Sequence, residues 1–209
     1  MKINIKENNY VSYKPVKSIF WGWKVHCAYE TTKMKYNGEP QNATDVPSNF
    51  HALSGSWTLW SHLPHDTDWS LNSYTKICQF NTVEEAVAVT EMLPPKLIVN
   101  CMLFLMRTGI SPIWEDVRNR NGGCFSYKVA NADVPFSWKQ LTYSIVGETI
   151  SNTQSILPHV NGITISPKKN FCIVKIWLGN CEFQSAAVIR ELVGITPHGC
   201  LFKRHVPEY

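Results

Sequence analysis

The chain has 209 residues, of which 44% are hydrophobic and 17% charged, and its formal net charge is +4. This balance predicts a folded domain with a sizeable core and excludes an intrinsically disordered chain. The charge is compatible with an anionic partner but is lower than in many proteins that bind duplex DNA. The longest nearly apolar run, residues 97–106, is far shorter than the roughly 20 residues that span a bilayer. Residues 1–9 lack the apolar segment of a signal peptide, so we expect a cytoplasmic protein without a membrane span.

The first fifty residues differ from the rest in composition. They are rich in Asn, Lys, Thr and Tyr, and lysines outnumber acids there. The apolar cluster around Trp21 and Trp23 is too hydrophobic for a freely solvated tail. We predict a partly docked extension over residues 1–50 and a main domain over residues 51–209.

The first elements of the main domain are predicted from alternation and capping. Large residues predict a strand at 57–60 and a second strand at 69–80, with a polar turn between them. Residues 83–93 have a helical pattern, with Thr82 able to cap the first turn and Glu85 at the capping-box position. The two prolines that follow should end this helix.

The second half of the chain interleaves strands and helices. We predict strands at 97–106, 125–129, 163–165 and 171–177, and helices at 136–148 and 182–193. The hairpin-like spacing of the strands favours an α+β fold, with a mostly antiparallel sheet and helices on one face.

Enzyme and metal motifs are weak in this sequence. We find no P-loop, dinucleotide fingerprint, nucleophile elbow or zincin motif, which argues against an enzyme. The seven cysteines contain no C-x-x-C pair, so reduced thiols are expected. His62, His65, Asp66 and Asp68 could be forced into a metal site, but a polar turn is the preferred interpretation. We expect no metal and no other cofactor.

The segment around Trp114 carries the strongest indication of a ligand. An indole next to a carboxylate suits guanine, because the base can stack on Trp114 while Glu115 accepts hydrogen bonds from its N1–H and N2 amino group. Methylation at N7 would add a cation–π contribution of about 0.5 to 2 kcal/mol. Trp69 is the best placed residue for the opposite wall. The alternative is that both indoles only cover the edges of the core.

Lys168 and Lys169 lie in the loop between two predicted strands. They could bind phosphates, although a solvated basic turn is an ordinary alternative.

Taken in order, these residues resemble the mRNA cap-binding translation initiation factor, initiation factor 4E. The resemblance covers about residues 50 to 200. It rests most on Trp-Glu-Asp at 114–116 followed by Asn-x-x-Gly-Gly at 119–123, and on the order of the other tryptophans. It implies a curved, mostly antiparallel sheet of about eight strands, with three helices on the convex face and a cap-binding slot on the concave face.

The resemblance also implies roles for single residues. Trp69 and Trp114 would stack on the two sides of 7-methylguanine, Glu115 would bind its edge, and Trp177 would lie beside the methyl group. Lys168 falls at the position of a phosphate-binding arginine of the family. A lysine keeps the charge but lacks the bidentate guanidinium, and Lys169 could compensate for that loss. The arginine that usually follows Gly-Gly is replaced by Cys124. Further RNA contacts are expected at Lys203 and Arg204.

Other departures fall on the face where the family binds a helical peptide of a 4G-like scaffold protein. Val87 replaces a tryptophan of the family, which should weaken the usual peptide and indicates an altered or dedicated partner. The residues expected on this partner surface are His51, Val83, Val87, Lys139, Gln140 and Tyr143.

The resulting hypothesis is a binder of capped mRNA that acts in translation initiation in the cytoplasm, or in the host cytoplasm if a virus encodes it. It would be a monomer outside its complex. The alternative is a cap-binding decoy or translational repressor whose altered surface does not recruit the usual scaffold.

Overall fold

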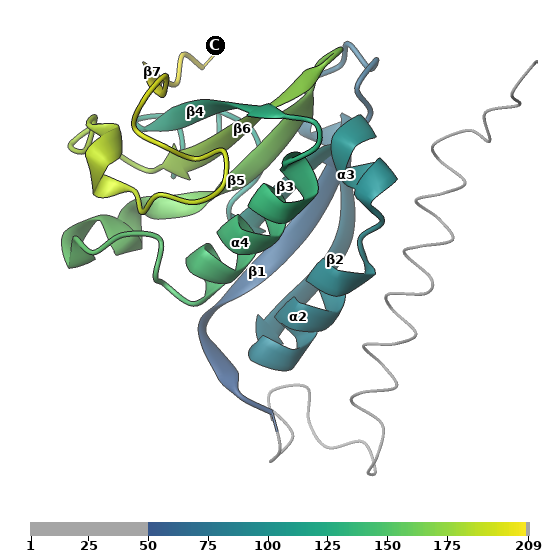
Figure 1. Ribbon diagram of the computed structural model, residues 1–209, viewed down its shortest axis with the longest axis horizontal. Helices are drawn as coiled ribbons and strands as arrows, with labels where there is room; N and C mark the ends of the chain where they lie inside the picture. The colour runs from purple at the N-terminus through teal and green to yellow at the C-terminus, as the bar shows by residue number, and fades with distance from the viewer. Residues whose placement is uncertain (1–49, 208–209) are drawn as a thin grey trace, which may run out of the picture.

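One antiparallel sheet of seven strands organises the computed structural model, which describes residues 50–207 (Figure 1). The predicted extension with Trp21 and Trp23 lies outside the described residues, save for residue 50. The strand order is β2-β1-β3-β5-β6-β4-β7, and every neighbouring pair is antiparallel. The strands are β1 Ala52–His62, β2 Thr75–Thr82, β3 Met102–Arg107, β4 Gly123–Ala130, β5 Val160–Pro167, β6 Phe171–Leu178 and β7 Leu201–Arg204.

Three α-helices lie over one face of the sheet (Figure 1). They are α2 Val83–Met92, α3 Pro95–Asn100 and α4 Val134–Val146. Short 3-10 helices are η1 Leu71–Ser73, η2 Gln154–His159 and η3 Ala186–Val188. The predicted fold class is therefore confirmed, with seven strands in the described part of the chain where about eight were expected.

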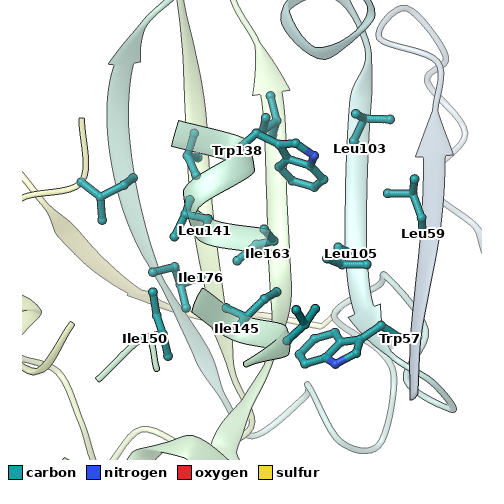
Figure 2. Close-up of a cluster of buried hydrophobic side chains, with 14 of the residues drawn as sticks. Trp57, Leu59, Leu103, Leu105, Trp138, Leu141, Ile145, Ile150, Ile163 and Ile176 are labelled. Atoms are coloured by element: carbon teal, nitrogen blue, oxygen red, sulfur yellow. The ribbon is translucent and has the colours of Figure 1, made fainter. Parts of the chain in front are cut away.

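Alternation along the strands divides the interior into two clusters. Leu103 and Leu105 of β3 join the large core beneath α4, whereas Phe104 and Met106 face the other side and pack with Trp177. Figure 2 shows part of the large core, with Trp57, Leu59, Leu103, Leu105, Trp138, Leu141, Ile145, Ile150, Ile163 and Ile176 labelled.

The two main helices begin and end close to their predicted limits. The Thr82 side chain accepts a hydrogen bond of 3.3 Å from the backbone N–H of Glu85, and Glu85 accepts one from the backbone N–H of Asn81. The helix ends at Met92, before the two prolines. Asp133 is the N-cap position of α4, which begins at Val134, two residues before its predicted start.

The predicted strand at 97–106 is wrong in its first half. Residues 97–100 belong to α3, which begins at Pro95, and the strand starts only at Met102. Proline fits the first turn of a helix, and the side chain of Asn100 donates to the carbonyl of Lys96 at 2.7 Å. The apolar run was thus shared between a short helix and a strand, which periodicity alone does not separate.

The predicted strand at 69–80 is wrong at its beginning, because β2 starts at Thr75. The carboxylate of Asp66 accepts from the backbone of Asp68 at 3.0 Å, and that of Asp68 accepts from the backbone of Ser70 at 2.8 Å. These local bonds form a turn in place of a ladder. Trp69 is consequently presented by a loop.

The predicted helix at 182–193 is also wrong, because only Ala186–Val188 forms a 3-10 turn. Distant residues take the backbone groups that a helix would use. The carbonyl of Ile150 accepts from the N–H of Arg190 at 2.8 Å, and the Ser137 hydroxyl donates to the carbonyl of Val193 at 2.6 Å. The third helix of the face is α3.

None of the helices in the described range 50–207 is both long and apolar enough to cross a bilayer.

Candidate functional site

A pocket of about 920 Å³ opens on the face of the sheet opposite the α-helices. This volume is in the range of small-molecule sites. Its floor includes Phe104 of β3 and Trp177 of β6, and its walls come from two loops. Of the residues predicted to bind a nucleotide, five line this pocket: Trp69, Trp114, Glu115, Lys168 and Trp177.

The loop that presents Trp114 is held by the polar residues of the same motif. The carboxylate of Asp116 accepts from the backbone N–H of Ser111 at 2.8 Å. Asn119 is fully buried and donates to the carbonyls of Ser111 and Ile113, both at 2.8 Å. The residues of the motif therefore have two roles. Trp114 and Glu115 line the pocket, and Asp116 and Asn119 hold the loop in place.

The two glycines at the end of this motif are required by close packing. A Cβ atom at Gly122 would lie 1.8 Å from the carbonyl oxygen of Leu178, and one at Gly123 would lie 2.5 Å from the ring of Phe202. No side chain fits in either place. The loop is thereby pressed against β6 and β7.

Trp69 is 53% exposed, and one of its faces is supported by a histidine. The rings of His62 and Trp69 are stacked, with centroids 4.5 Å apart and planes 7° from parallel. His62 is fixed in turn, because its Nε2 donates to the carbonyl of Asp68 at 2.8 Å. This histidine, together with Asp66 and Asp68, therefore orders the turn that presents Trp69.

Trp114 is supported in a similar way by His205, which the sequence did not single out. The two rings lie 5.6 Å apart with planes 16° from parallel, and His205 also contacts Trp177 at 4.9 Å. Nδ1 of His205 donates to the carbonyl of Asn119 at 2.7 Å. Burial lowers the pKa of His205, the charge of Lys175 lowers it further, and the Asn119 bond and Glu115 act in the opposite direction.

Both sides of the pocket thus place a histidine behind an indole, which is exposed in Trp69 and partly buried in Trp114. A ring that is already packed on one face offers its other face at little entropic cost. No sequence pattern near His205 marks it, since β7 brings it to Trp114 by pairing with β4.

The rest of the pocket combines aromatic and acidic groups. Tyr74 lies at 5.2 Å from Phe104, and its pKa is raised by burial and by the charges of Glu115 and Asp68. Trp177 is only 3% exposed, and a Cβ atom at the neighbouring Gly162 would lie 2.3 Å from the carbonyl oxygen of Leu105. The floor is therefore tightly packed.

The predicted basic residues separate into two groups. Lys168 lines the pocket, whereas Lys169 is not among its lining residues. Lys175 lines it although the sequence did not single it out, and its Nζ is 5.9 Å from the centre of the Trp114 ring. Lys203 approaches the same ring at 5.8 Å from β7, but neither Lys203 nor Arg204 is part of the lining.

The predicted partner surface lies on the helical face. Val83 and Val87, one turn apart on α2, are 43% and 41% exposed. His51 is bound to Glu84 at the start of this helix, with 2.7 Å between Nδ1 and Oε1. Phe136 of α4 is also exposed, but it was not among the residues that the sequence predicted for this surface.

Polar contacts join the second helix of this surface to its neighbours. Lys139 forms an ion pair with Glu91, and the hydroxyl of Tyr143 donates to the same carboxylate at 2.8 Å. Gln140 instead accepts from the backbone N–H of Val193 at 3.2 Å, so it ties the segment after η3 to α4.

An open antiparallel sheet with helices on one face and an aromatic pocket on the other defines an α+β protein whose pocket has the shape and lining for a flat ring. The family model described as "Eukaryotic initiation factor 4E" matches residues 52–196. The chain therefore belongs to the eukaryotic initiation factor 4E family.

Relatives within this family are distant. Translation initiation factor 4E-2 of Schizosaccharomyces pombe is 31% identical over 151 residues, covering 68% of this chain and 59% of that protein. Translation initiation factor 4E of Eremothecium gossypii is 31% identical over 134 residues, covering 61% of this chain and 62% of that protein. The chain therefore spans about three fifths of the length of these relatives.

Solved structures agree with the fold. A schistosome initiation factor 4E in complex with m7GpppG and 4E-BP aligns with a TM-score of 0.58 and 25% identity. The alignment covers 64% of this chain and 75% of the schistosome chain.

Proposed function

We propose that this protein binds the 7-methylguanosine 5′ cap of mRNA and acts in translation initiation in the cytoplasm. One observation carries the proposal: Trp69 and Trp114 line a single pocket with Glu115 and Trp177, each indole backed by a histidine. Membership of the initiation factor 4E family supports it, as does the cap dinucleotide bound by the schistosome relative.

Each group in the pocket has a defined task in this proposal. The cationic methylated base stacks between Trp69 and Trp114, where cation–π attraction favours it over neutral guanine. Glu115 accepts from the two donors of the guanine edge, and Trp177 contacts the methyl group. Lys168 attracts the phosphates, with Lys169 contributing from outside the pocket lining. Lys203 and Arg204 contact the RNA beyond the cap.

The domain limits and the partner belong to the same proposal. All pocket residues fall between Pro64 and Val206, which supports a cap-binding domain over residues 51–209 and an extension before it. The partner is a helical peptide of a 4G-like scaffold that binds across the exposed Val83 and Val87, and the 4E-BP bound to the schistosome relative supports this part of the proposal. The protein binds without catalysis, so incubation with a cap dinucleotide should give no turnover.

The test is a tryptophan-fluorescence titration with 7-methyl-GTP and, in parallel, GTP. We expect saturable quenching by the methylated ligand at concentrations where GTP has no effect. Trp114→Ala should lose this response because the stacking surface is removed. Equal responses to both ligands would reject the proposed function.

A further inference from the structure

The acidic and basic groups that line the pocket come from different elements of the fold. Its only acidic lining residues in the described part of the chain, Asp68 and Glu115, belong to the loops that carry Trp69 and Trp114. The lysines that line it, Lys168 and Lys175, belong to the turn between β5 and β6 and to β6, respectively. The two loops therefore offer acceptors for hydrogen-bond donors, and the β5–β6 hairpin offers groups that suit an anion.

The basic end has polar groups arranged along two paired strands. Lys175 is two residues from Trp177 on β6, so both side chains lie on the same face, about 7 Å apart along the strand. Thr164 of β5 is directly opposite Lys175, and Ser166 follows on the same face in the direction of Lys168. Lys175, Thr164, Ser166 and Lys168 therefore form a row of polar side chains that leads away from Trp177 toward the hairpin turn.

Thr164 is a buried polar group without a partner. Its side chain is 1% exposed, it lines the pocket, and its hydroxyl makes no hydrogen bond within the described residues. Such a group costs free energy unless something binds it. Lys175 is likewise in none of the ion pairs among residues 50–207, which use Glu84, Glu91 and Glu148.

We propose that Lys175 and Thr164 bind the phosphate chain of the nucleotide, between the base slot and Lys168. This inference rests on the proposed function and extends it to two residues without an assigned role. A base stacked on Trp114 lies within reach of Lys175, whose Nζ is 5.9 Å from that ring. The phosphates then follow the row along β5 and β6, with an ammonium group at each end and hydroxyl donors between them.

The experiment compares 7-methylguanosine with its mono-, di- and triphosphate, by fluorescence titration of the full chain at two salt concentrations. Lys175→Met keeps the length of the side chain and removes its charge. We expect it to weaken triphosphate binding by about tenfold and to reduce the salt dependence, with no effect on the nucleoside. Thr164→Val should weaken the triphosphate less, without lowering the melting temperature, because it removes an unpaired hydroxyl.

Lys128→Met is the matched control. Lys128 is exposed on β4, where its Nζ lies 4.4 Å from the Phe171 ring, and it is not part of the pocket lining. The Lys128→Met protein should bind every ligand with the same affinity as the parent. Lys175→Gln serves as the second variant if the methionine variant does not fold.

The outcomes separate this inference from the proposed function. If the parent prefers 7-methyl-GTP and Lys175→Met binds it equally well, the phosphates lie elsewhere and this inference alone is wrong. An equal loss for nucleoside and triphosphate would also overturn it, since Lys175 would then act on the base or on Trp114. If the parent shows no preference for the methylated ligand, the proposed function is wrong and this inference is rejected with it.

Discussion

Glu115 is the residue on which the choice of base depends in the proposed slot. It lines the pocket beside Trp114, and Asp116 and Asn119 hold its loop. A carboxylate accepts from both donors of the guanine edge, whereas adenine has no such pair of donors. The neighbouring residues therefore set its position, and its charge sets its specificity.

Glu115→Gln should weaken the binding of 7-methyl-GTP by about 1.5 to 3 kcal/mol, because an amide hydrogen would face a donor of the base. The measurement is the fluorescence titration, with the exposed Glu191→Gln as control. Unchanged affinity in Glu115→Gln would remove Glu115 from the guanine edge.

His205 should make the stability of the fold depend on pH. Burial is the main reason that its pKa in the folded protein is lowered, while in the unfolded chain it is the ordinary value near 6.5. Below pH 6.5 the imidazole of His205 is protonated in the unfolded chain before it is protonated in the folded protein. The free energy of unfolding therefore decreases as the pH falls from 6.5 through the folded pKa. Lys175 and Glu115, the charged groups that face it, act in opposite directions.

His205→Phe keeps a ring behind Trp114 and removes the titrating group. Its free energy of unfolding should therefore depend less on pH between 7.5 and 5 than that of the parent. Denaturant unfolding at several pH values measures this difference. Parallel pH profiles for the two proteins would show that another group is responsible.

At the scale of elements, the loop from Ile110 to Gly123 is built as one unit. Asn119 joins it to itself through the carbonyls of Ser111 and Ile113, and its Oδ1 accepts from Asn161 of β5 at 2.9 Å. His205 then bonds to the Asn119 carbonyl. The side-chain amide of Asn119 thus connects the loop of Trp114 to the sheet, and the backbone carbonyl of the same residue connects it to the segment after β7.

Asn119→Ala should lower the free energy of unfolding by about 2 to 4 kcal/mol, because several buried partners lose their bonds at once. It should also weaken cap binding by misplacing Trp114. Thermal unfolding and the fluorescence titration measure the two effects. Asn100→Ala is the control, because Asn100 is exposed and loses only one hydrogen bond within α3. Its effects on the free energy of unfolding and on cap binding should be no more than a few tenths of those of Asn119→Ala.

On the scale of the whole molecule, the sheet separates two surfaces. The pocket occupies one face, and α2 and α4 expose Val83, Val87 and Phe136 on the other. The proposed cap and the proposed partner therefore bind on opposite sides and can be tested independently.

Val87→Trp should strengthen the binding of a helical peptide from a 4G-like scaffold by about 1 to 2 kcal/mol, since an indole restores a large apolar contact. Calorimetry with the peptide measures it, and 7-methyl-GTP binding serves as the internal control because the slot is on the other face. If Val87→Trp leaves peptide affinity unchanged, the partner does not bind across α2. A parent that binds the cap but no scaffold peptide would favour the decoy hypothesis.

Much of the pocket could be predicted from the sequence because its parts are local. Trp114, Glu115, Asp116 and Asn119 lie within a few residues, so their spacing alone identifies the loop, and α2 follows from its cap. Trp69 was predicted from its place after the polar turn and Trp177 through the family resemblance, and both line the same pocket. Their roles in binding stay predictions until a ligand is titrated.

Only the tertiary structure decided which distant residues join them. His205, Lys175 and Thr164 reach the pocket through the pairing of β7 with β4 and of β5 with β6, and strand pairing is not encoded in any short segment. For the same reason residues 182–193 do not form the predicted helix, because groups on distant segments bind their backbone. The family, the sheet and the indoles could be predicted from the sequence, and long-range packing determined what supports them.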